Sequence, residues 1–414
     1  METSNDASDF FLMSERLTPA ERTRSAQIRA FVRNDLEPVI SEAWERAEFP
    51  MSLVPALRKL GVAGTTISDH GCPGMTVREQ GLTAFELSRG DGSINTFLAV
   101  QSGLAMGTID LLGSEEQRSR WLPGMARLEL IGAFAMTEPG HGSDSVALET
   151  RAERQGDSYV LSGAKRWIGN GSIANITIIW ARDTADDEVK AFVLERPDGA
   201  DFPAGYRPEV ITGKIGKRAI QQADITIDQL RLPADQLLAR SQNFADAVTV
   251  LNRTRANASW EALGHASAAF DIALAYAQER EQFGSPIAAT QLVQNRLAEM
   301  LADISAMTTL CFRAAELAED DRLTGPMSSL LKLHTANRGR AVCRSARDLL
   351  GGNGLLLERH IARHLTDMEV VHTYEGTEFI QSLLVGRELT GISAFSRGRS
   401  PRRAATQRGS GVLR

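Results

Sequence analysis

The run Tyr374-Glu375-Gly376-Thr377 places a carboxylate in a polar turn directly before an apolar stretch, residues 379–384. Such a position suits a general base at the mouth of a pocket, because apolar neighbours keep water away from the carboxylate and raise its pKa toward neutrality. A helix-start acid near the positive end of the helix dipole explains the same run by itself. Glu375 is therefore a candidate base whose role depends on the rest of the chain.

Two other segments predict a site for a planar ligand with a polar rim. In residues 134–144, an apolar run ends in a turn of Pro, Gly and Ser, which frees backbone N–H groups and hydroxyls at a strand end. In residues 165–171, an indole stands between basic residues and a glycine turn. Hydroxyl and N–H groups can bind the rim of such a ligand and the indole its face. A buried Trp in an ordinary strand pair explains either segment alone.

Four motifs in one order and spacing carry a resemblance to a known family. They are Met136-Thr137-Glu138-Pro139-Gly140-His141-Gly142-Ser143-Asp144, Arg280-Glu281-Gln282-Phe283-Gly284-Ser285-Pro286-Ile287, Leu350-Gly351-Gly352-Asn353-Gly354 and Tyr374-Glu375-Gly376-Thr377. Ordered motifs are far more specific than a lone glycine pattern. From about residue 18 to residue 395 the chain resembles the acyl-CoA dehydrogenases, and within them the glutaryl-CoA dehydrogenases and the plant short-chain acyl-CoA oxidases.

The resemblance implies a mainly α fold with a central β-domain: an N-terminal helical domain, a middle β-barrel-like domain and a C-terminal four-helix bundle. A chain of 414 residues is too long for one ordinary core, which also predicts several domains. We expect a disordered N-terminus (1–17), a helical domain (18–130), a β-domain (131–240), a helical bundle (241–395) and a basic disordered tail (396–414).

Local patterns support this division. Thr18, Pro19 and Glu21 form a helix-start signal with a capping box. Short β-branched runs separated by turn residues predict the strands of the middle domain. Helical periodicity then predicts long helices that pack as a bundle. The predicted strand runs are residues 159–161, 176–180, 191–194 and 224–228, and the predicted helices are 243–282, 288–319, 327–350 and 377–390.

Composition limits the partners and the compartment. The net charge of −6 gives no reason to expect nucleic acid or an anionic membrane, and no apolar stretch has the length of a membrane span. The acidic N-terminus is typical of neither a signal nor a transit peptide, and the C-terminus is not a peroxisomal signal. Cys72, Cys311 and Cys343 are odd in number and widely spaced, which indicates reduced thiols. We expect a cytoplasmic enzyme.

The resemblance implies FAD-dependent α,β-dehydrogenation of a short- or medium-chain acyl-CoA to the trans-2-enoyl-CoA, with flavin N5 as hydride acceptor. Glu375 matches the base. Hydrogen bonds to the thioester oxygen, from the N–H of the base and a ribityl hydroxyl, stabilise the developing enolate. Some relatives carry the base on a bundle helix instead. The matching position here is Thr254, which cannot ionise, and this favours Glu375.

The resemblance also implies residues for FAD and for the substrate. Arg280, Phe283 and Gln291 match residues that hold the FAD of a neighbouring subunit, which implies a homotetramer. The other matching FAD positions are Phe134, Met136, Thr137, Trp167, Ile168, Gly169, Asp348, Gly351, Gly352, Thr377 and Phe395. The matching substrate positions are Ser143, Arg255, Asn95, Tyr374 and Gly376, of which Ser143 and Arg255 match contacts to CoA.

Two departures from the pattern of relatives bear on specificity. Asn95 stands where glutaryl-CoA dehydrogenases carry an arginine for the distal carboxylate. A neutral amide cannot supply that charge-assisted contact, so we predict an uncharged acyl chain, with no decarboxylation. Gly169 stands where most dehydrogenases have a Thr or Ser that bonds flavin N5. The plant oxidases share this glycine, which raises the hypothesis that O2, rather than an electron-transfer flavoprotein, accepts the electrons.

Other interpretations are less favoured. A flavin monooxygenase on the same scaffold would generally lack the glutamate, and a non-catalytic acyl-CoA-binding protein would not bleach its flavin with a thioester. His360 and His364 lie one helical turn apart, but no third ligand or following Glu is apparent, so we expect no metal site. The turn 351–354 lacks the preceding strand of a dinucleotide fingerprint.

Overall fold

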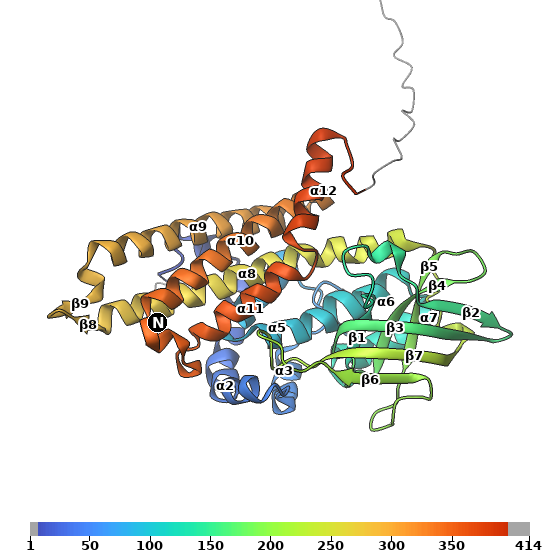
Figure 1. Cartoon of the computed structure of the whole chain (residues 1–414). Helices are drawn as coiled ribbons and strands as arrows, with labels where there is room; N and C mark the ends of the chain where they lie inside the picture. The colour runs from blue at the N-terminus through green and yellow to red at the C-terminus, as the bar shows by residue number, and fades with distance from the viewer. Residues whose placement is uncertain (1–6, 396–414) are drawn as a thin grey trace, which may run out of the picture.

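The computed structural model describes residues 7–395. Along the chain it shows a helical part, a sheet and a helical bundle (Figure 1), which confirms the expected fold class. The predicted disordered ends at residues 1–6 and 396–414 lie outside the described residues. Within residues 7–395, no helix combines the length and the apolar character needed to cross a membrane.

The N-terminal part is built from short helices, and the start of α1 is capped as the sequence predicts. The Thr18 side chain accepts a hydrogen bond from Glu21 N at 3.2 Å, and the Glu21 carboxylate accepts one from Thr18 N at 2.7 Å. Residues 13–16, expected within a disordered terminus, form η1 because Asp9 accepts hydrogen bonds from Met13 N and Ser14 N. The elements are η1 (Met13–Arg16), α1 (Pro19–Phe31), the π-helix η2 (Val32–Leu36), α2 (Glu37–Arg46), η3 (Met51–Leu53), α3 (Val54–Leu60), α4 (Val77–Gly90), α5 (Gly92–Ala99), the π-helix η4 (Val100–Met106), α6 (Gly107–Leu112) and α7 (Glu115–Ala126).

Asp91 fixes the corner between α4 and α5. Its carboxylate accepts a hydrogen bond from Ser93 N at 2.7 Å, which caps α5, and pairs with the buried guanidinium of Arg363 at 2.6 Å. Both side chains of this pair are almost completely buried. The corner therefore ties α5 to the C-terminal bundle and orients the residues that α5 presents to the interior.

The middle part is one curled sheet of seven strands within the described residues. The strand order is β1-β4-β2-β3-β7-β6, with β5 on the other edge of β4. β4 pairs in parallel with β1 and β2, and the remaining pairs are antiparallel. The strands are β1 (Gly132–Ala135), β2 (Arg151–Gln155), β3 (Ser158–Gly169), β4 (Ile176–Asp183), β5 (Val189–Glu195), β6 (Tyr206–Val210) and β7 (Gln222–Pro233), with short turns η5 (Ser145–Ala147) and η6 (Ala234–Gln236).

The C-terminal part is a bundle in which α10 packs against α8, α9, α11 and α12. Among the long helices, the sequence prediction omitted α11. Figure 1 shows the small β8–β9 hairpin at the end of the bundle that is far from the sheet. The elements are α8 (Phe244–Glu279), β8 (Glu281–Gln282), β9 (Ser285–Pro286), η7 (Ile287–Ala289), α9 (Gln291–Glu319), α10 (Gly325–Leu349), η8 (Gly351–Leu355), η9 (Leu357–Arg359), α11 (Ile361–Thr373) and α12 (Glu378–Thr390).

The three parts of the chain are joined by shared apolar cores. One apolar cluster joins the N-terminal helices to one face of the sheet, including Ile178 and Trp180. A second joins Leu82 of α4 to Trp260 and other side chains of the bundle. A third covers the opposite face of the sheet. The N-terminal helices are thus packed between sheet and bundle, and the junction of all three parts is the place where a buried site can form.

Candidate active site

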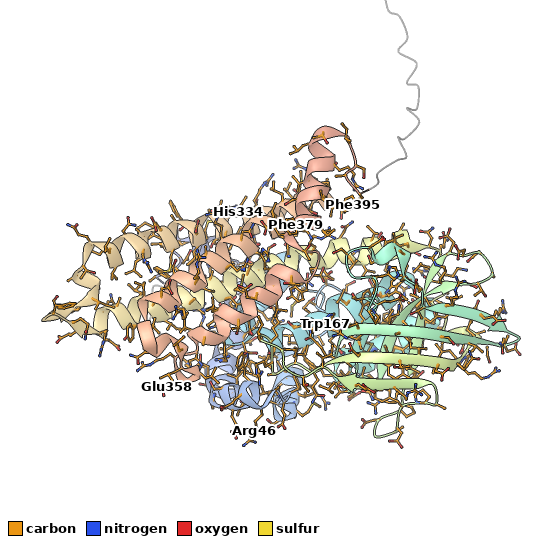
Figure 2. The ribbon with its side chains drawn as sticks, viewed as in Figure 1. Arg46, Trp167, His334, Glu358, Phe379 and Phe395 are labelled. Atoms are coloured by element: carbon orange, nitrogen blue, oxygen red, sulfur yellow. The ribbon has the colours of Figure 1, made fainter. Side chains whose placement is uncertain are left out.

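A cavity of about 760 Å³ lies where the three parts meet. α4, α5 and η4 contribute one wall, the ends of β1 and β3 a second, and α8 with residues 369–377 a third. Figure 2 places Trp167 at the end of the sheet that faces the helices. The volume is in the range of small-molecule and cofactor sites in proteins.

The sheet wall brings together the residues that the sequence grouped as a ligand platform. A register shift between Lys165 and Ile168 marks a bulge in β3, and Trp167 within it adopts a left-handed backbone with φ 64°. The indole is 49% exposed although it lies beside the cavity, so one apolar surface is left uncovered by the chain. The predicted residues on this wall are Phe134, Met136, Thr137, Trp167, Ile168 and Gly169.

A buried ion pair holds the strand end that carries Met136 and Thr137. Lys165 Nζ donates to Glu138 Oε1 at 2.8 Å and to the Met136 carbonyl at 3.1 Å. Thr150 donates to the same carboxylate from its N–H at 2.9 Å and its hydroxyl at 2.6 Å. Burial raises the pKa of Glu138, but Lys165 and these hydrogen bonds outweigh it and leave the pKa lowered. The platform is therefore fixed from behind before any ligand binds.

The space around Gly169 is narrow. An added Cβ would lie 3.0 Å from Val100 Cγ2 and 3.7 Å from Ile220 Cδ1. Gly169 lines the cavity without a side chain, and Val100 of η4 lies against the place that a side chain would take. A larger residue here would need Val100 to move.

Glu375 lies in the turn between α11 and α12, and side chains of α12 and α10 hold the main chain of this turn. Glu375 and Gly376 are both left-handed, with φ 54° and 89°, and at the second position glycine has no steric cost. Gln381 Nε2 donates to the Glu375 carbonyl at 2.7 Å. Lys332 Nζ of α10 donates to the carbonyls of Gly376 at 2.7 Å and His372 at 3.0 Å. The turn is therefore fixed from both sides.

The Glu375 carboxylate faces the cavity and contacts α8. The Thr254 hydroxyl lies within hydrogen-bond distance of both carboxylate oxygens. Burial raises the pKa of Glu375, opposed by Arg255, the Thr254 hydroxyl and Lys332. Burial also lowers the pKa of Arg255, and it lowers that of Lys332 to about 8. A carboxylate with a raised pKa beside a cavity is the arrangement expected of a general base.

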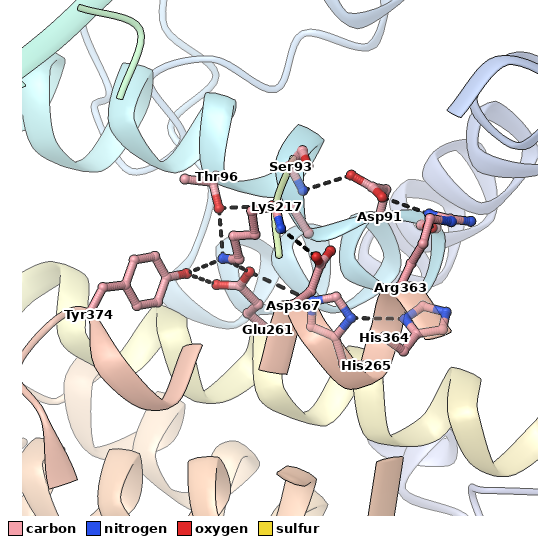
Figure 3. A network of polar contacts seen from close by, with 12 residues as sticks. Asp91, Ser93, Thr96, Lys217, Glu261, His265, Arg363, His364, Asp367 and Tyr374 are labelled. Carbon is pink, nitrogen blue, oxygen red and sulfur yellow. Dashed lines mark hydrogen bonds and ion pairs between the residues drawn. The ribbon is translucent and has the colours of Figure 1, made fainter. Parts of the chain in front are cut away.

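A cluster under the site was missed by the sequence reasoning. Lys217 Nζ donates at 2.7 Å to the Thr96 hydroxyl and at 2.7 Å to the Tyr374 hydroxyl, and it pairs with Glu261 (Figure 3). The Tyr374 hydroxyl in turn donates to Glu261. Burial raises the pKa of Glu261, but Lys217 and His265 outweigh it and lower the pKa to about 2. A signal existed: Glu261 is a lone charge in the Ala-rich stretch 256–264 and stands two turns after Thr254.

The cluster continues into the bundle. Lys217 N donates to Asp367 at 2.5 Å, and the Nδ1 atoms of His265 and His364 lie 2.9 Å apart. His364, one of the two histidines discounted as metal ligands, is thus engaged with another imidazole. These contacts fix Tyr374, the residue before the candidate base, to α8 and α11.

The remaining predicted residues fall into two groups. Ser143, Asn95, Arg255, Tyr374, Gly376 and Thr377 line the same cavity as Glu375. Arg280, Phe283, Gln291, Asp348, Gly351 and Gly352 instead lie at the hairpin end of the bundle, away from the cavity of their own chain. Asn353 Nδ2 donates to the Tyr276 hydroxyl at 2.9 Å and joins the glycine turn to the end of α8. Phe395 follows α12, is half-exposed and does not line the cavity.

Family models for acyl-CoA dehydrogenases match three consecutive parts of the chain: the N-terminal domain at residues 18–129, the middle domain at 133–230 and the C-terminal domain at 244–390. The chain belongs to the acyl-CoA dehydrogenase family. Acyl-CoA dehydrogenases are FAD-dependent oxidoreductases that act on CH–CH groups, so FAD is the cofactor. The half-exposed indole of Trp167 and the hydroxyl of Thr137 on one cavity wall fit such a planar group.

This acyl-CoA dehydrogenase is similar to relatives with different substrates in their names. The mitochondrial short-chain specific acyl-CoA dehydrogenase of Bos taurus is 31% identical over 366 residues, 87% of this chain and 88% of the relative. A glutaryl-CoA dehydrogenase from Mycobacterium smegmatis in complex with FADH2 matches with a TM-score of 0.90 at 34% identity, covering 93% of this chain and 98% of that one. Butyryl-CoA dehydrogenase from Megasphaera elsdenii matches with a TM-score of 0.85 at 27% identity, covering 90% and 98%.

Proposed function

We propose that the protein dehydrogenates the Cα–Cβ bond of a short- or medium-chain acyl-CoA to the trans-2-enoyl-CoA, with Glu375 as the base. The observation that carries the proposal is the Glu375 carboxylate, which faces the cavity with a raised pKa and contacts the Thr254 hydroxyl. Bound FAD supplies the acceptor for the β-hydrogen, which leaves as hydride. The α-proton passes to Glu375 as the bond is oxidised.

The thioester carbonyl must be polarised before a carboxylate can remove the α-proton. The Glu375 N–H donates no hydrogen bond to another of residues 7–395, so it is available to that carbonyl oxygen. The bonds from Lys332 and Gln381 hold the turn that presents this N–H. The turn thus orients both the carboxylate and the carbonyl donor. Arg255 and Ser143, on opposite walls of the cavity, are proposed to contact CoA.

The hairpin end of the bundle supports a proposal about assembly. Phe283 is fully exposed at the hairpin tip, and Arg280 closes α8 beside it. Because these residues and Gln291 lie far from the cavity of their own chain, we assign them to the FAD of a neighbouring subunit in a homotetramer. Asp348, Gly351 and Gly352 are assigned to the adenosine half of FAD, and Phe395 to a further contact.

The electron acceptor is proposed to be an electron-transfer flavoprotein. The alternative is an oxidase that transfers electrons to O2 and releases hydrogen peroxide. Gly169, where the cavity wall carries no side chain, favours the alternative. Glutaryl-CoA is disfavoured as substrate because Asn95 offers no charge to a distal carboxylate.

The test is anaerobic reduction of the purified yellow protein by a panel of acyl-CoA thioesters, followed by flavin absorbance. Glu375→Gln should retain its flavin yet be reduced by the best thioester about 10²–10⁴-fold more slowly, the usual contribution of a positioned base. Glu378→Gln is the matched control, because Glu378 binds Asn337 and His372 outside the cavity and should leave the rate within about threefold. Undiminished reduction of Glu375→Gln would refute the assignment.

A further inference from the structure

The cavity extends past the base along one face of α8. Thr254, Ala258 and Glu261 line it at helical spacing, so it continues for about 10 Å beyond Thr254. In the proposed function, the CoA thioester is held at Glu375 and the rest of the acyl chain enters this deeper part. The side chains there therefore determine which acyl chains fit.

The deeper part is more polar than a saturated acyl chain requires. Gln80 and Thr83 of α4, and Asn95 and Thr96 of α5, line it together with Asn257 of α8. Apolar lining is interspersed among them: Ala84, Leu87, Leu98, Ala99 and Ala258. A pocket for an alkyl chain gains nothing from amides and hydroxyls, because each must give up water without a partner in the ligand.

The charged groups at the deep end are already satisfied by one another. The three donors of the Lys217 ammonium bind Thr96, Tyr374 and Glu261. The Tyr374 hydroxyl occupies the second oxygen of Glu261. The pair is neutral as a whole and offers no free cation, so a substrate carboxylate would be buried here without a counter-ion.

Asn95 is different, because its amide has no partner. The side chain is 3% exposed and lines the cavity, and its Nδ2 makes no hydrogen bond within residues 7–395. Asn257 on the facing helix has a buried Oδ1 that is likewise unpaired in the described chain. By contrast, the Thr83 hydroxyl donates to the Glu79 carbonyl at 2.8 Å. A buried polar group without a partner is costly, which indicates that a ligand supplies one.

We propose that the acyl chain carries an uncharged hydroxyl beyond Cβ and that Asn95 is the residue that recognises it. A hydroxyl both donates and accepts, so it can pair with the Asn95 amide in either orientation of that amide. A carboxylate is excluded by the closed Lys217–Glu261 pair, and a plain alkyl chain leaves the Asn95 amide unpaired. This inference rests on the proposed acyl-CoA dehydrogenation.

The experiment compares ω-hydroxyacyl-CoA thioesters, from butanoyl to octanoyl, with their unsubstituted parents and with glutaryl-CoA. Two quantities are measured: kcat/KM from flavin reduction by the holoenzyme, and the dissociation constant for Glu375→Gln by calorimetry, which involves no turnover. For at least one chain length, the hydroxylated thioester should be preferred about tenfold or more in both. Asn95→Leu should bring this ratio close to one, chiefly by weakening the binding of the hydroxylated substrate. Thr83→Val should leave the ratio unchanged, because that hydroxyl is already bound.

The possible outcomes distinguish a failure of this inference from a failure of the proposed function. If parent acyl-CoAs reduce the flavin as well as the hydroxylated ones and Asn95→Leu leaves the ratio unchanged, the inference is wrong and the dehydrogenase assignment stands. A preference for glutaryl-CoA overturns it as well. If no thioester reduces the flavin, the proposed function fails and the inference with it. Should Asn95→Leu not fold, the wild-type ratio and Asn95→Ala decide the question.

Discussion

The Thr254 hydroxyl lies 3.2 Å from one carboxylate oxygen of Glu375 and 3.3 Å from the other. A hydrogen bond to the ionised form stabilises it, so this contact lowers a pKa that burial raises. The base acts when deprotonated, so kcat/KM should rise with pH through the pKa of Glu375 in the free enzyme. Removing the hydroxyl with Thr254→Val should raise that pKa and move the acid limb of the profile to higher pH.

The measurement is a pH profile of flavin reduction under anaerobic conditions. Thr249→Val on the same helix is the control, because its exposed hydroxyl binds only the Ala245 carbonyl among the described contacts. An acid limb that stays in place in Thr254→Val, or moves equally in both variants, would contradict the assigned contact.

The buried Lys217–Glu261 pair predicts an asymmetric effect of mutation on stability. Lys217→Met leaves the Glu261 carboxylate buried without a cation and should cost about 3–5 kcal/mol of unfolding free energy. Lys217→Met/Glu261→Gln should be less destabilised because no charge remains unpaired. Arg46→Met, which breaks an exposed pair with Glu42, should cost at most about 1 kcal/mol. Denaturation of the holoenzymes compares all three.

The pH dependence of this effect has a definite sign. The pKa of Glu261 is lowered from 4.5 to about 2 in the folded protein. Its contribution to stability is therefore present above pH 4.5 and is lost as the pH falls toward 2. In Lys217→Met, burial without the cation favours the protonated carboxyl, so the stability gap to wild type should narrow as the pH is lowered. A gap that widens in acid would show that the pair does not act as described.

Gly169 allows the proposed electron-transfer flavoprotein to be tested against O2 as the electron acceptor. In the oxidase alternative, wild type would release hydrogen peroxide during turnover in air, and Gly169→Ser with Val100→Ala would release less per thioester oxidised. The second change makes room, because an added Cβ lies 3.0 Å from Val100 Cγ2. Gly140→Ser, where an added Cβ meets nothing within 4 Å, is the control. Absence of peroxide from the wild type would identify a conventional dehydrogenase.

The exposed hairpin predicts shared cofactor binding between subunits. Arg280→Ala should weaken FAD retention about tenfold or more, because a charge-assisted contact to a phosphate is lost from a site on another chain. Arg322→Ala, an exposed cation elsewhere, should retain FAD as wild type does. Flavin absorbance after gel filtration and the mass of the eluted species measure both effects. Unchanged FAD content in a monomeric Arg280→Ala protein would exclude the shared site.

The sequence predicted those elements of the fold that local patterns specify. The α8 helix was expected at 243–282 and occupies Phe244–Glu279, because its Ala-rich periodicity and the Asn243 cap are local signals. The turn that contains Glu375 was also predicted from the sequence. The π-helix η4 was not, because a shifted hydrogen-bond register leaves no side-chain period to detect. Val100, on η4, is the residue that narrows the space at Gly169.

The sequence predicted the residues of the candidate site that belong to recognisable motifs. Trp167, Thr137 and Glu375 come from three separate motifs and line one cavity. The Lys217–Glu261 cluster was missed because Thr96 and Tyr374 lie 121 and 157 residues from Lys217. Glu261 carried a local signal, as the lone charge of an Ala-rich stretch, but no local pattern links it to Lys217.

The contacts from α10 and α8 to the Glu375 turn make proton abstraction sensitive to the distance between these two helices. Lys332 of α10 binds the carbonyl of Gly376, next to the base, whereas the carboxylate of the base contacts Thr254 of α8. Deep in the bundle, an added Cβ at Gly339 of α10 would lie 2.8 Å from Met368 Cε of α11 and 3.2 Å from the Ala262 carbonyl of α8. A methyl group there would displace Met368 and press α10 away from α8, the two helices that hold the base and its turn.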